Sequence, residues 1–233
     1  MKLIQKSKEP NDLQVHRGQN GTDYESFKRD VGLGDISPAT GLRKSLLDEQ
    51  GYICAYCMKR IPHSHTENGA TSDKMKVEHF VPQTNATSIA QKLDITYTNM
   101  FACCMGNHGQ REAFETCDTR KGESSLTITP LREADIRTLI YGADGSIFST
   151  NATFETEINQ ILNLNEDNLK RQREEIYKLI VGRVKKEFSK PNLTRQQKNA
   201  YLDTQINWWN SKQDGKFQPF CMVAIKYLES RKR

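Results

Sequence analysis

The sequence predicts an α+β fold in which a turn-rich, cysteine-rich section lies between an N-terminal arm and a mainly helical C-terminal region. Five of the six cysteines fall between Cys54 and Cys117, among short segments of alternating polarity that are typical of strands. Beyond residue 150, apolar residues recur at steps of three and four, which indicates amphipathic helices. We therefore expect an arm at residues 1–41, a cysteine-rich domain at 42–130, and a β-hairpin with helices at 131–233.

Length and composition exclude several classes of protein. The 233 residues are 36% hydrophobic and 27% charged, which is unlike collagen, mucin-like or disordered chains. The longest apolar run near the C-terminus, residues 220–225, is far shorter than the about 20 residues of a membrane helix. The first twelve residues lack the apolar core of a signal peptide. We expect a soluble, cytoplasmic protein with reduced cysteines and no membrane partner.

Charge is distributed unevenly along the chain. The net charge is +5, but residues 170–233 contain sixteen Lys and Arg against six Asp and Glu. A basic C-terminal third is compatible with a polyanionic partner, but charge alone favours the alternative of a solvated helical surface.

The N-terminal and middle elements follow from local patterns. Residues 1–40 show little periodicity and predict an extended arm with one short helix at 24–29. Leu42, Leu46 and Leu47 have helical spacing, and Gly51 is a plausible stop. Residues 76–81 alternate like a strand, and residues 98–103 predict a second one. The segment that starts at Cys117 predicts a short helix ending near Gly122.

The C-terminal elements have clearer signals. In the segment at 139–148, Asp144-Gly145 predicts the turn of a β-hairpin. Apolar spacing then predicts a pair of helices over residues 154–162 and 169–184, and Ser189-Lys190-Pro191 ends the second one. Two further helices are expected around residues 201–209 and 219–229.

The cysteine spacing predicts a zinc site. Cys54 and Cys57 in CAYC have the spacing of a zinc knuckle, in which one turn presents two thiolates to one tetrahedral ion. Cys104 and Cys117 are the natural second pair. Cys103 is adjacent to Cys104, and only one of the two can easily face the ion. Reduced core cysteines are the alternative interpretation.

A second group of polar residues lies between these cysteines. Glu78 and His79 place a carboxylate beside an imidazole at a strand end, Asn99 follows twenty residues later, and Asp118 comes directly after Cys117. A carboxylate is a hard ligand for a divalent cation, and histidine is a base near neutral pH. Hydrolysis of a phosphodiester needs both kinds of group.

Four motifs occur in a fixed order between Cys54 and Gly122: C-x-x-C, Glu-His-x-x-Pro, Asn-x4-Cys and Cys-Asp-x-x-Lys-Gly. This order resembles the HNH endonucleases, whose fold is a zinc-framed ββα-metal finger. The resemblance implies that His79 is the general base and that Asn99 fastens the finger loop and orients the base. It also implies that Glu78 and Asp118 bind a catalytic cation, Mg²⁺ or Mn²⁺.

The same resemblance bears on the zinc ligands. The family spacing of five residues from the Asn to the next cysteine selects Cys104 over Cys103. The family usually has C-x-x-C as its second pair, whereas this chain inserts residues 105–116. The insertion leaves the ligand set open, with His108 as a possible substitute.

Four segments along the whole chain narrow the resemblance to the PtuB-type HNH proteins of Septu and retron-associated anti-phage systems. They are LLDEQGYICAYC, CDTRKG, ILNLNEDNLKRQREEI and PFCMVAIKYLESR. This implies an effector nuclease that acts on DNA or RNA in a complex with a PtuA-type ATPase. A retron reverse transcriptase with its RNA–DNA product is a further possible partner. The alternative is a zinc-framed nucleic-acid-binding or scaffold subunit without catalysis.

Overall fold

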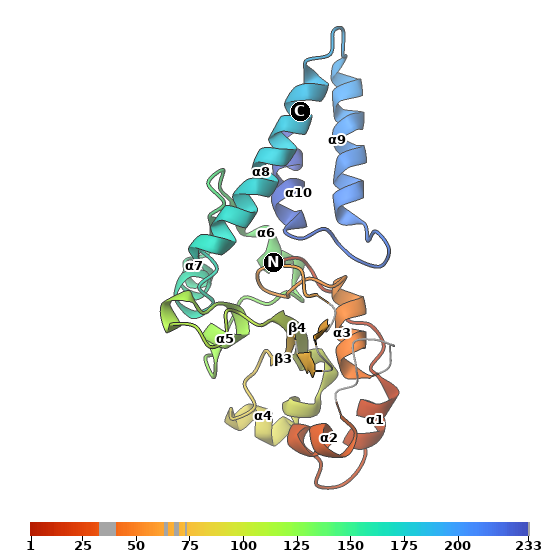
Figure 1. Cartoon of the computed structure of the whole chain (residues 1–233), viewed down its shortest axis with the longest axis vertical. Helices are drawn as coiled ribbons and strands as arrows, with labels where there is room; N and C mark the ends of the chain where they lie inside the picture. Colours follow the sequence, from red (N-terminus) through yellow and green to blue (C-terminus); the bar gives the residue numbers. More distant parts are fainter. Residues whose placement is uncertain (33–40, 63–64, 68–69, 73, 233) are drawn as a thin grey trace.

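A computed structural model of the chain describes residues 1–32, 41–62, 65–67, 70–72 and 74–232. The molecule is elongated, with a pair of short strands near its middle and three long helices at one end (Figure 1). The α+β class is therefore confirmed. Residues 33–40 of the predicted arm lie outside the described residues. None of the described helices is long and apolar enough to span a bilayer.

Two strands and a short helix form the centre of the molecule. Strand β3 (Met75–His79) pairs antiparallel with β4 (Met100–Cys104), in a register that places Glu78 opposite Phe101. All five residues of β4 are buried. Helix α5 (Cys117–Lys121) follows in the chain and packs against β4. The centre thus has the order strand, strand, helix.

Helix α3 (Leu42–Gln50) packs against β4 on another side. Its three leucines are buried, as their spacing predicts. The helix ends where Gly51 adopts the left-handed conformation, with φ of 59°. A side chain at Gly51 would overlap with the Phe217 ring, so glycine also permits the close approach of the segment that precedes the last helix.

The Gln50 side chain ties α3 to the centre. It is 3% exposed, and its Nε2 donates to the carbonyl oxygens of Ile53 at 3.0 Å and Ala102 at 2.8 Å. Its Oε1 accepts from the Ala102 backbone N–H at 2.8 Å. The Ala102 carbonyl also accepts from Ala55 N–H, so it keeps one partner without Gln50.

We expect Gln50→Ala to lower the free energy of unfolding by on the order of 3 kcal/mol. The substitution removes the partner from the Ala102 N–H and the Ile53 carbonyl, and each unsatisfied buried group costs about 1–3 kcal/mol. Urea denaturation of the full-length protein measures the change. Gln91→Ala, at an exposed position, should change it by less than about 0.5 kcal/mol; equal effects of the two variants would contradict the prediction.

The N-terminal residues form more structure than the sequence predicts. Helix α2 (Tyr24–Asp30) lies where a short helix is expected, but α1 (Asn11–Arg17) is not predicted. Helix α1 buries only two of its side chains, so its sequence has little periodic signal. Leu13 and Phe27 are completely buried in the same core as the central strands. The arm is therefore packed on the protein rather than extended.

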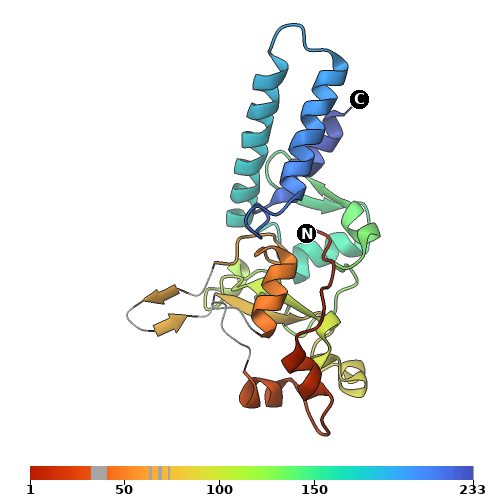
Figure 2. The same ribbon diagram turned by 90° about the vertical axis from the view of Figure 1, so that its right-hand side faces the viewer.

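The C-terminal region follows the predicted order closely. Strands β5 (Leu139–Tyr141) and β6 (Ile147–Ser149) form the hairpin, in which Gly145 has φ of 78°. The helices that follow are α7 (Ala152–Thr156), its π-helical continuation (Glu157–Ile161), α8 (Asp167–Phe188), α9 (Arg195–Asn210) and α10 (Cys221–Arg231). Helices α8 and α9 form a long hairpin, and α10 packs against both (Figures 1 and 2).

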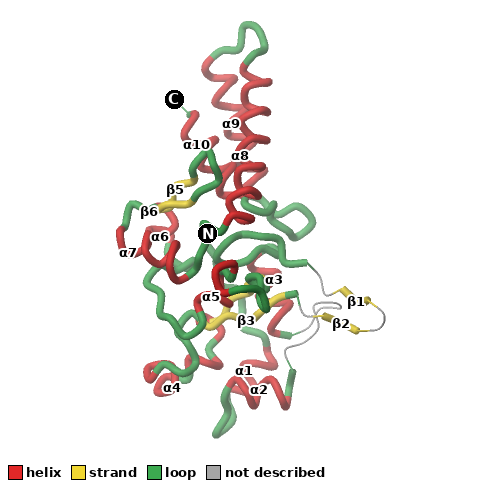
Figure 3. The backbone as a smooth tube through the Cα atoms, turned by 60° about the vertical axis from the view of Figure 1, so that its left-hand side comes forward, coloured by secondary structure: helices red, strands yellow, loops and turns green. Residues whose placement is uncertain are grey.

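The remaining elements are short. Strands β1 (His65–Glu67) and β2 (Ala70–Ser72) form a separate antiparallel pair that projects from the body of the molecule (Figure 3). The others are α4 (Ala86–Gln91), α6 (Glu133–Arg137) and the 3₁₀ turns Leu93–Ile95, Tyr97–Asn99 and Glu112–Phe114.

Candidate functional site

Four buried cysteines meet beside the central strands: Cys54, Cys57, Cys104 and Cys117. Their sulfur atoms all lie within 4.8 Å of one another. The Sγ of Cys104 is 3.7 Å from that of Cys57 and 3.9 Å from that of Cys117. A tetrahedral zinc ion with Zn–S bonds of about 2.3 Å keeps its sulfurs about 3.8 Å apart. The group therefore fits a structural metal such as zinc.

The first pair of thiols lies on a tight turn. The Cys54 carbonyl accepts from the Met58 N–H at 3.0 Å, and the Cys54 N–H donates to the Lys59 carbonyl at 2.9 Å. Met58 has φ of 64°, which turns the chain so that the Lys59 N–H donates to the Cys57 sulfur at 3.4 Å. The two-residue spacing thus lets one turn present both sulfurs to the same point.

The second pair comes from two elements. Cys104 ends β4 and Cys117 begins α5, and the twelve residues between them loop out and return. Gly106 makes the return possible: it has φ of 55°, its carbonyl accepts from the Thr116 N–H at 2.9 Å, and a Cβ there would overlap with the Thr116 carbonyl oxygen. The insertion therefore does not separate Cys104 from Cys117.

The two alternative ligands lie outside this group. His108 is exposed in the loop. Cys103 is buried and interacts with Cys54, but its sulfur is not among the four that converge. The structure therefore brings together the four cysteines that the spacing predicts.

Two carboxyl groups, outside the cysteine group, lie on β3 and α5: Glu78 and Asp118. Glu78 is 2% exposed, and its Oε1 accepts from the Tyr56 hydroxyl at 2.6 Å and lies 2.8 Å from the Lys121 ammonium. Asp118, whose side chain is 19% exposed, lies 3.4 Å from the ammonium of Lys76. Burial, followed by the hydrogen bond and the negative charge of Asp118, raises the pKa of Glu78 well above its usual range, although Lys121 opposes the shift. Both carboxyl groups therefore face an ammonium group, and their oxygens are of the kind that could hold a hard divalent cation.

The His79 ring follows Glu78 in the chain, and its hydrogen bonds define its protonation. Its Nε2 lies 2.8 Å from the Asp94 carbonyl oxygen, which can only accept, so Nε2 carries the hydrogen. Its Nδ1 lies 3.1 Å from the Gln83 Nε2, which donates to it. The Nδ1 lone pair is therefore the proton-accepting position of a neutral imidazole.

Helix α2 covers the His79 ring. The Tyr24 ring meets it edge to face with centroids 4.5 Å apart, and the Tyr24 N–H donates to the Asp94 carboxylate at 2.9 Å. The imidazole is only 5% exposed. Burial lowers the pKa of His79 below its usual value, because the charged form is less hydrated there. The ring is thus kept neutral.

Asn99 holds the chain that leaves β3. Its Oδ1 accepts from the Val81 N–H at 2.8 Å, and its Nδ2 donates to the carbonyls of Val81 and Leu93, each at 3.0 Å. These bonds connect the segment after His79 to the turn that contains Asp94. Asn99 therefore holds in place the two chain segments that contact the His79 ring, one with Gln83 and the other with Asp94.

Sequence reasoning gave no role to five side chains that surround these groups: Tyr24, Tyr56, Gln83, Asp94 and Lys121, the last of which is the Lys of the Cys-Asp-x-x-Lys-Gly motif. Lys121 lies three residues after Asp118 on one helix, where it also donates to the His79 carbonyl at 3.0 Å, and this spacing is a usable signal. Gln83 lies four residues after His79, which is a weaker signal. Tyr24 and Asp94 reach the site through tertiary packing, so local patterns do not reveal them.

The chain therefore offers two separate centres for chemistry. One is a closed group of four thiols, and the other consists of the two carboxyl groups, with the neutral His79 ring close enough for the charge of Asp118 to act on its pKa. These groups lie on the strand–strand–helix centre, supported by α2 and α3. No protein-family model matches the chain, and the search of curated proteins finds no match to its sequence.

Proposed function

We propose that this protein is a metal-dependent endonuclease of the HNH class that hydrolyses phosphodiester bonds in nucleic acid. The observation that carries the proposal is the neutral His79 beside the Glu78–Asp118 carboxylates, with Nε2 bonded to a carbonyl and Nδ1 left as the proton acceptor. The strand–strand–helix centre agrees with the ββα-metal fold of that class.

The carboxylates fit a hard divalent cation. Glu78 and Asp118 offer oxygen ligands close together, and the negative charge of Asp118 contributes to the raised pKa of Glu78. They would hold Mg²⁺ or Mn²⁺, which supplies neutralisation of charge on the phosphate and on the leaving oxygen.

The chain's own residues then perform the proton transfer. In the proposed reaction a water molecule takes the place of Gln83 at His79 Nδ1 and gives its proton to that nitrogen. Its oxygen attacks phosphorus, the bond from phosphorus to the leaving sugar oxygen breaks, and that oxygen takes a proton from solvent. The Asp94 carbonyl stabilises the imidazolium that forms, because it accepts from Nε2–H.

The four cysteines have a different role in this proposal. An ion held by four thiolates has no open position for water, so zinc there would act on the fold and not on the substrate. Cys117 begins the helix that carries Asp118, and β4, which Cys104 ends, pairs with the strand that carries Glu78. Zinc would thereby hold the carboxylates in position.

Cleavage assays with and without a divalent cation test the proposal. We expect the zinc-loaded protein to cut DNA or RNA in the presence of Mg²⁺ or Mn²⁺. Cleavage should stop as soon as EDTA removes that cation, before EDTA can extract the zinc. Asp118→Asn should need much more Mg²⁺ for the same rate, because an amide oxygen carries no charge. Asp167→Asn is a matched control at an exposed helix start and should not change the Mg²⁺ requirement. Cation-independent cutting, or an equal Mg²⁺ requirement in Asp118→Asn, would argue against this site.

The pH dependence of cleavage follows from the burial of His79. Protonation of Nδ1 removes the base, and the lowered pKa means that this happens below pH 6.5, the ordinary value. We expect kcat/KM to stay high at pH 6.5 and to fall only at lower pH. Tyr24→Ala should hydrate the ring, raise its pKa and move the acid limb to higher pH. An acid limb that does not move in Tyr24→Ala would show that His79 is not the titrating base.

The resemblance to PtuB-type proteins extends the proposal to a partner and a setting. The protein would then be a cytoplasmic effector nuclease of an anti-phage complex with a PtuA-type ATPase, and with a retron reverse transcriptase where one is present.

A second candidate function is that of a finger without catalysis that binds nucleic acid or serves as a scaffold. The contacts of Gln83 with Nδ1 and of Lys121 with Glu78 favour that alternative, since both groups are occupied here. Nucleic-acid binding without cation-dependent cleavage would support it.

A further inference from the structure

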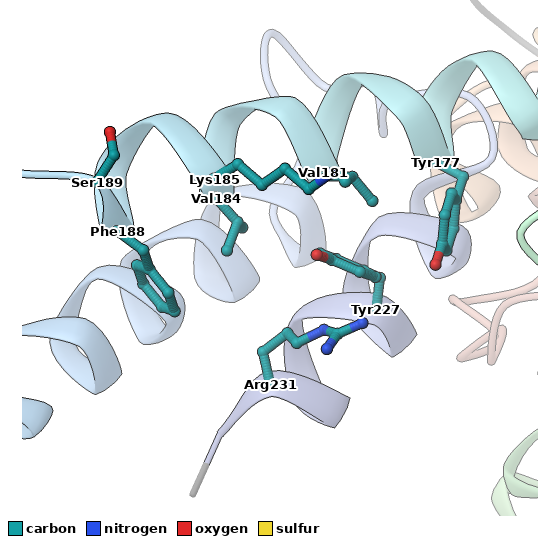
Figure 4. Close-up of a pocket in the computed structure, with 8 residues that line it drawn as sticks. All are labelled: Tyr177, Val181, Val184, Lys185, Phe188, Ser189, Tyr227 and Arg231. Atoms are coloured by element: carbon teal, nitrogen blue, oxygen red, sulfur yellow. The ribbon is translucent and has the colours of Figure 1, made fainter.

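An open groove runs between α8 and α10, at the end of the molecule away from the candidate catalytic site (Figures 1 and 4). Its volume is about 720 Å³. Helix α8 contributes Tyr177, Val181, Val184 and Phe188, and Tyr227 of α10 forms part of the opposite wall. None of these residues takes part in the metal or histidine chemistry described above.

The apolar lining has the spacing of one helix face. Its α8 positions are separated by four, three and four residues, which places them along about three helical turns, or about 16 Å. Val184 is buried, whereas Val181 and the aromatic residues are half-buried. A straight apolar strip of this length between two helices is the geometry that an amphipathic helix occupies in helix-in-groove recognition.

Positive charges border this strip. Lys185 and Arg231 line the groove itself, and Lys198 lines an adjoining hollow that also contains Phe188 and Arg231. Neither lining contains Asp or Glu. Among the described residues, no carboxylate forms an ion pair with Lys185, Lys198 or Arg231. These cations are therefore available to carboxylates of a partner.

The ring contacts disfavour a nucleic-acid strand. Arg231 lies over the Tyr227 ring at 4.8 Å, Lys198 lies over the Phe188 ring at 5.4 Å, and Tyr177 meets Tyr227 edge to face. Bases bind single-strand platforms by stacking on free aromatic faces, and cations already cover two of these rings. Helices α8 to α10 of a second copy carry the same excess of Lys and Arg, so they would be repelled.

We infer that this groove is the docking site for an acidic amphipathic helix of a partner protein. Leucine-like side chains of the partner would lie on Val181, between the aromatic walls. Its Asp and Glu residues would face Lys185, Lys198 and Arg231. The inference does not depend on nuclease activity, since it rests on the shape and charge of this end of the molecule.

Selection from a displayed library of peptides of about four helical turns, against the full-length protein, tests the inference. We expect the enriched peptides to be acidic and to carry apolar residues at steps of three and four. Two matched pairs of variants locate their site. Val181→Asp and Lys185→Glu should each weaken binding of such a peptide by about tenfold or more. Leu179→Asp, at a side chain that is 43% exposed outside the groove, and Lys186→Glu, next to Lys185, should leave it nearly unchanged.

The outcomes that would overturn the inference are distinct from a failure to fold. Thermal unfolding shows whether Val181→Asp is folded, and Lys185→Glu alters only an exposed side chain. The inference is wrong if the enriched peptides are not acidic, or if all four variants bind them equally. It is also wrong if a single-stranded oligonucleotide displaces the peptide and binds with the same dependence on Val181 and Lys185, since the groove would then take nucleic acid.

Discussion

Replacement of His79 by alanine is expected to slow cleavage by roughly a hundredfold to ten-thousandfold. The variant loses the proposed base, the His79 Nδ1, which is the accepting nitrogen because Nε2–H is bonded to the Asp94 carbonyl. Its zinc content and its affinity for nucleic acid should stay close to those of the wild type. Single-turnover rates with labelled DNA and RNA at saturating Mg²⁺ measure the effect.

His16→Ala is the matched control for this substitution. His16 is also a buried histidine, which contacts the Phe27 ring and lies 3.0 Å from the Ser26 hydroxyl, but it is outside the candidate site. The substitution His16→Ala should lower the stability of the protein without a comparable loss of cleavage rate, when both variants are assayed well below their unfolding temperatures. Equal rates for His79→Ala and the wild type would place the base elsewhere.

Cys54→Ala is expected to abolish tight zinc binding and to unfold the cysteine-rich section. A structural zinc site contributes on the order of 10–16 kcal/mol in small metal-dependent domains, which is as much as the net stability of a typical protein. The wild type should hold about one zinc per chain, measured by elemental analysis. The variant should hold none after dialysis, and its thermal unfolding should become broad or be lost.

Cys221→Ala separates this effect from the loss of a buried sulfur. Cys221 is completely buried at the start of α10, outside the four-cysteine group. The Cys221→Ala protein should keep its zinc, and its free energy of unfolding should fall only by the amount typical of a small core substitution, on the order of 1 kcal/mol. If Cys54→Ala retained zinc, or if the wild type contained none, the four-thiol site would not bind metal as we expect.

The parts of the fold that the sequence predicts are those with a local signal. The leucines of α3 and the apolar steps of α8 repeat at helical spacing, and Asp144-Gly145 marks a turn. The four cysteines could be predicted as one group because the C-x-x-C spacing indicates the first pair and the resemblance to HNH endonucleases indicates the second. That they converge despite the long insertion depends on Gly106, whose backbone conformation has no signal in the residues around it.

The parts that could not be predicted depend on contacts between distant segments. Tyr24 reaches His79 across fifty-five positions, and the short helix that carries it is held by the Asp94 carboxylate. The Asp94 carbonyl, which fixes the tautomer of His79, is a backbone group that any residue type would provide. A sequence shows which side chains can do the chemistry, but the state of the imidazole is set by groups that only the fold brings near.

Cleavage in water enriched in ¹⁸O tests the central claim most directly. Hydrolysis by a water activated at His79 predicts that each single-turnover cut places one solvent oxygen in the new terminal phosphate, detected by mass spectrometry of the product. The label should appear with Mg²⁺ or Mn²⁺ in the wild type and at a strongly reduced rate in His79→Ala. Cutting without incorporation, or no cation-dependent cutting of DNA or RNA at all, would contradict the account.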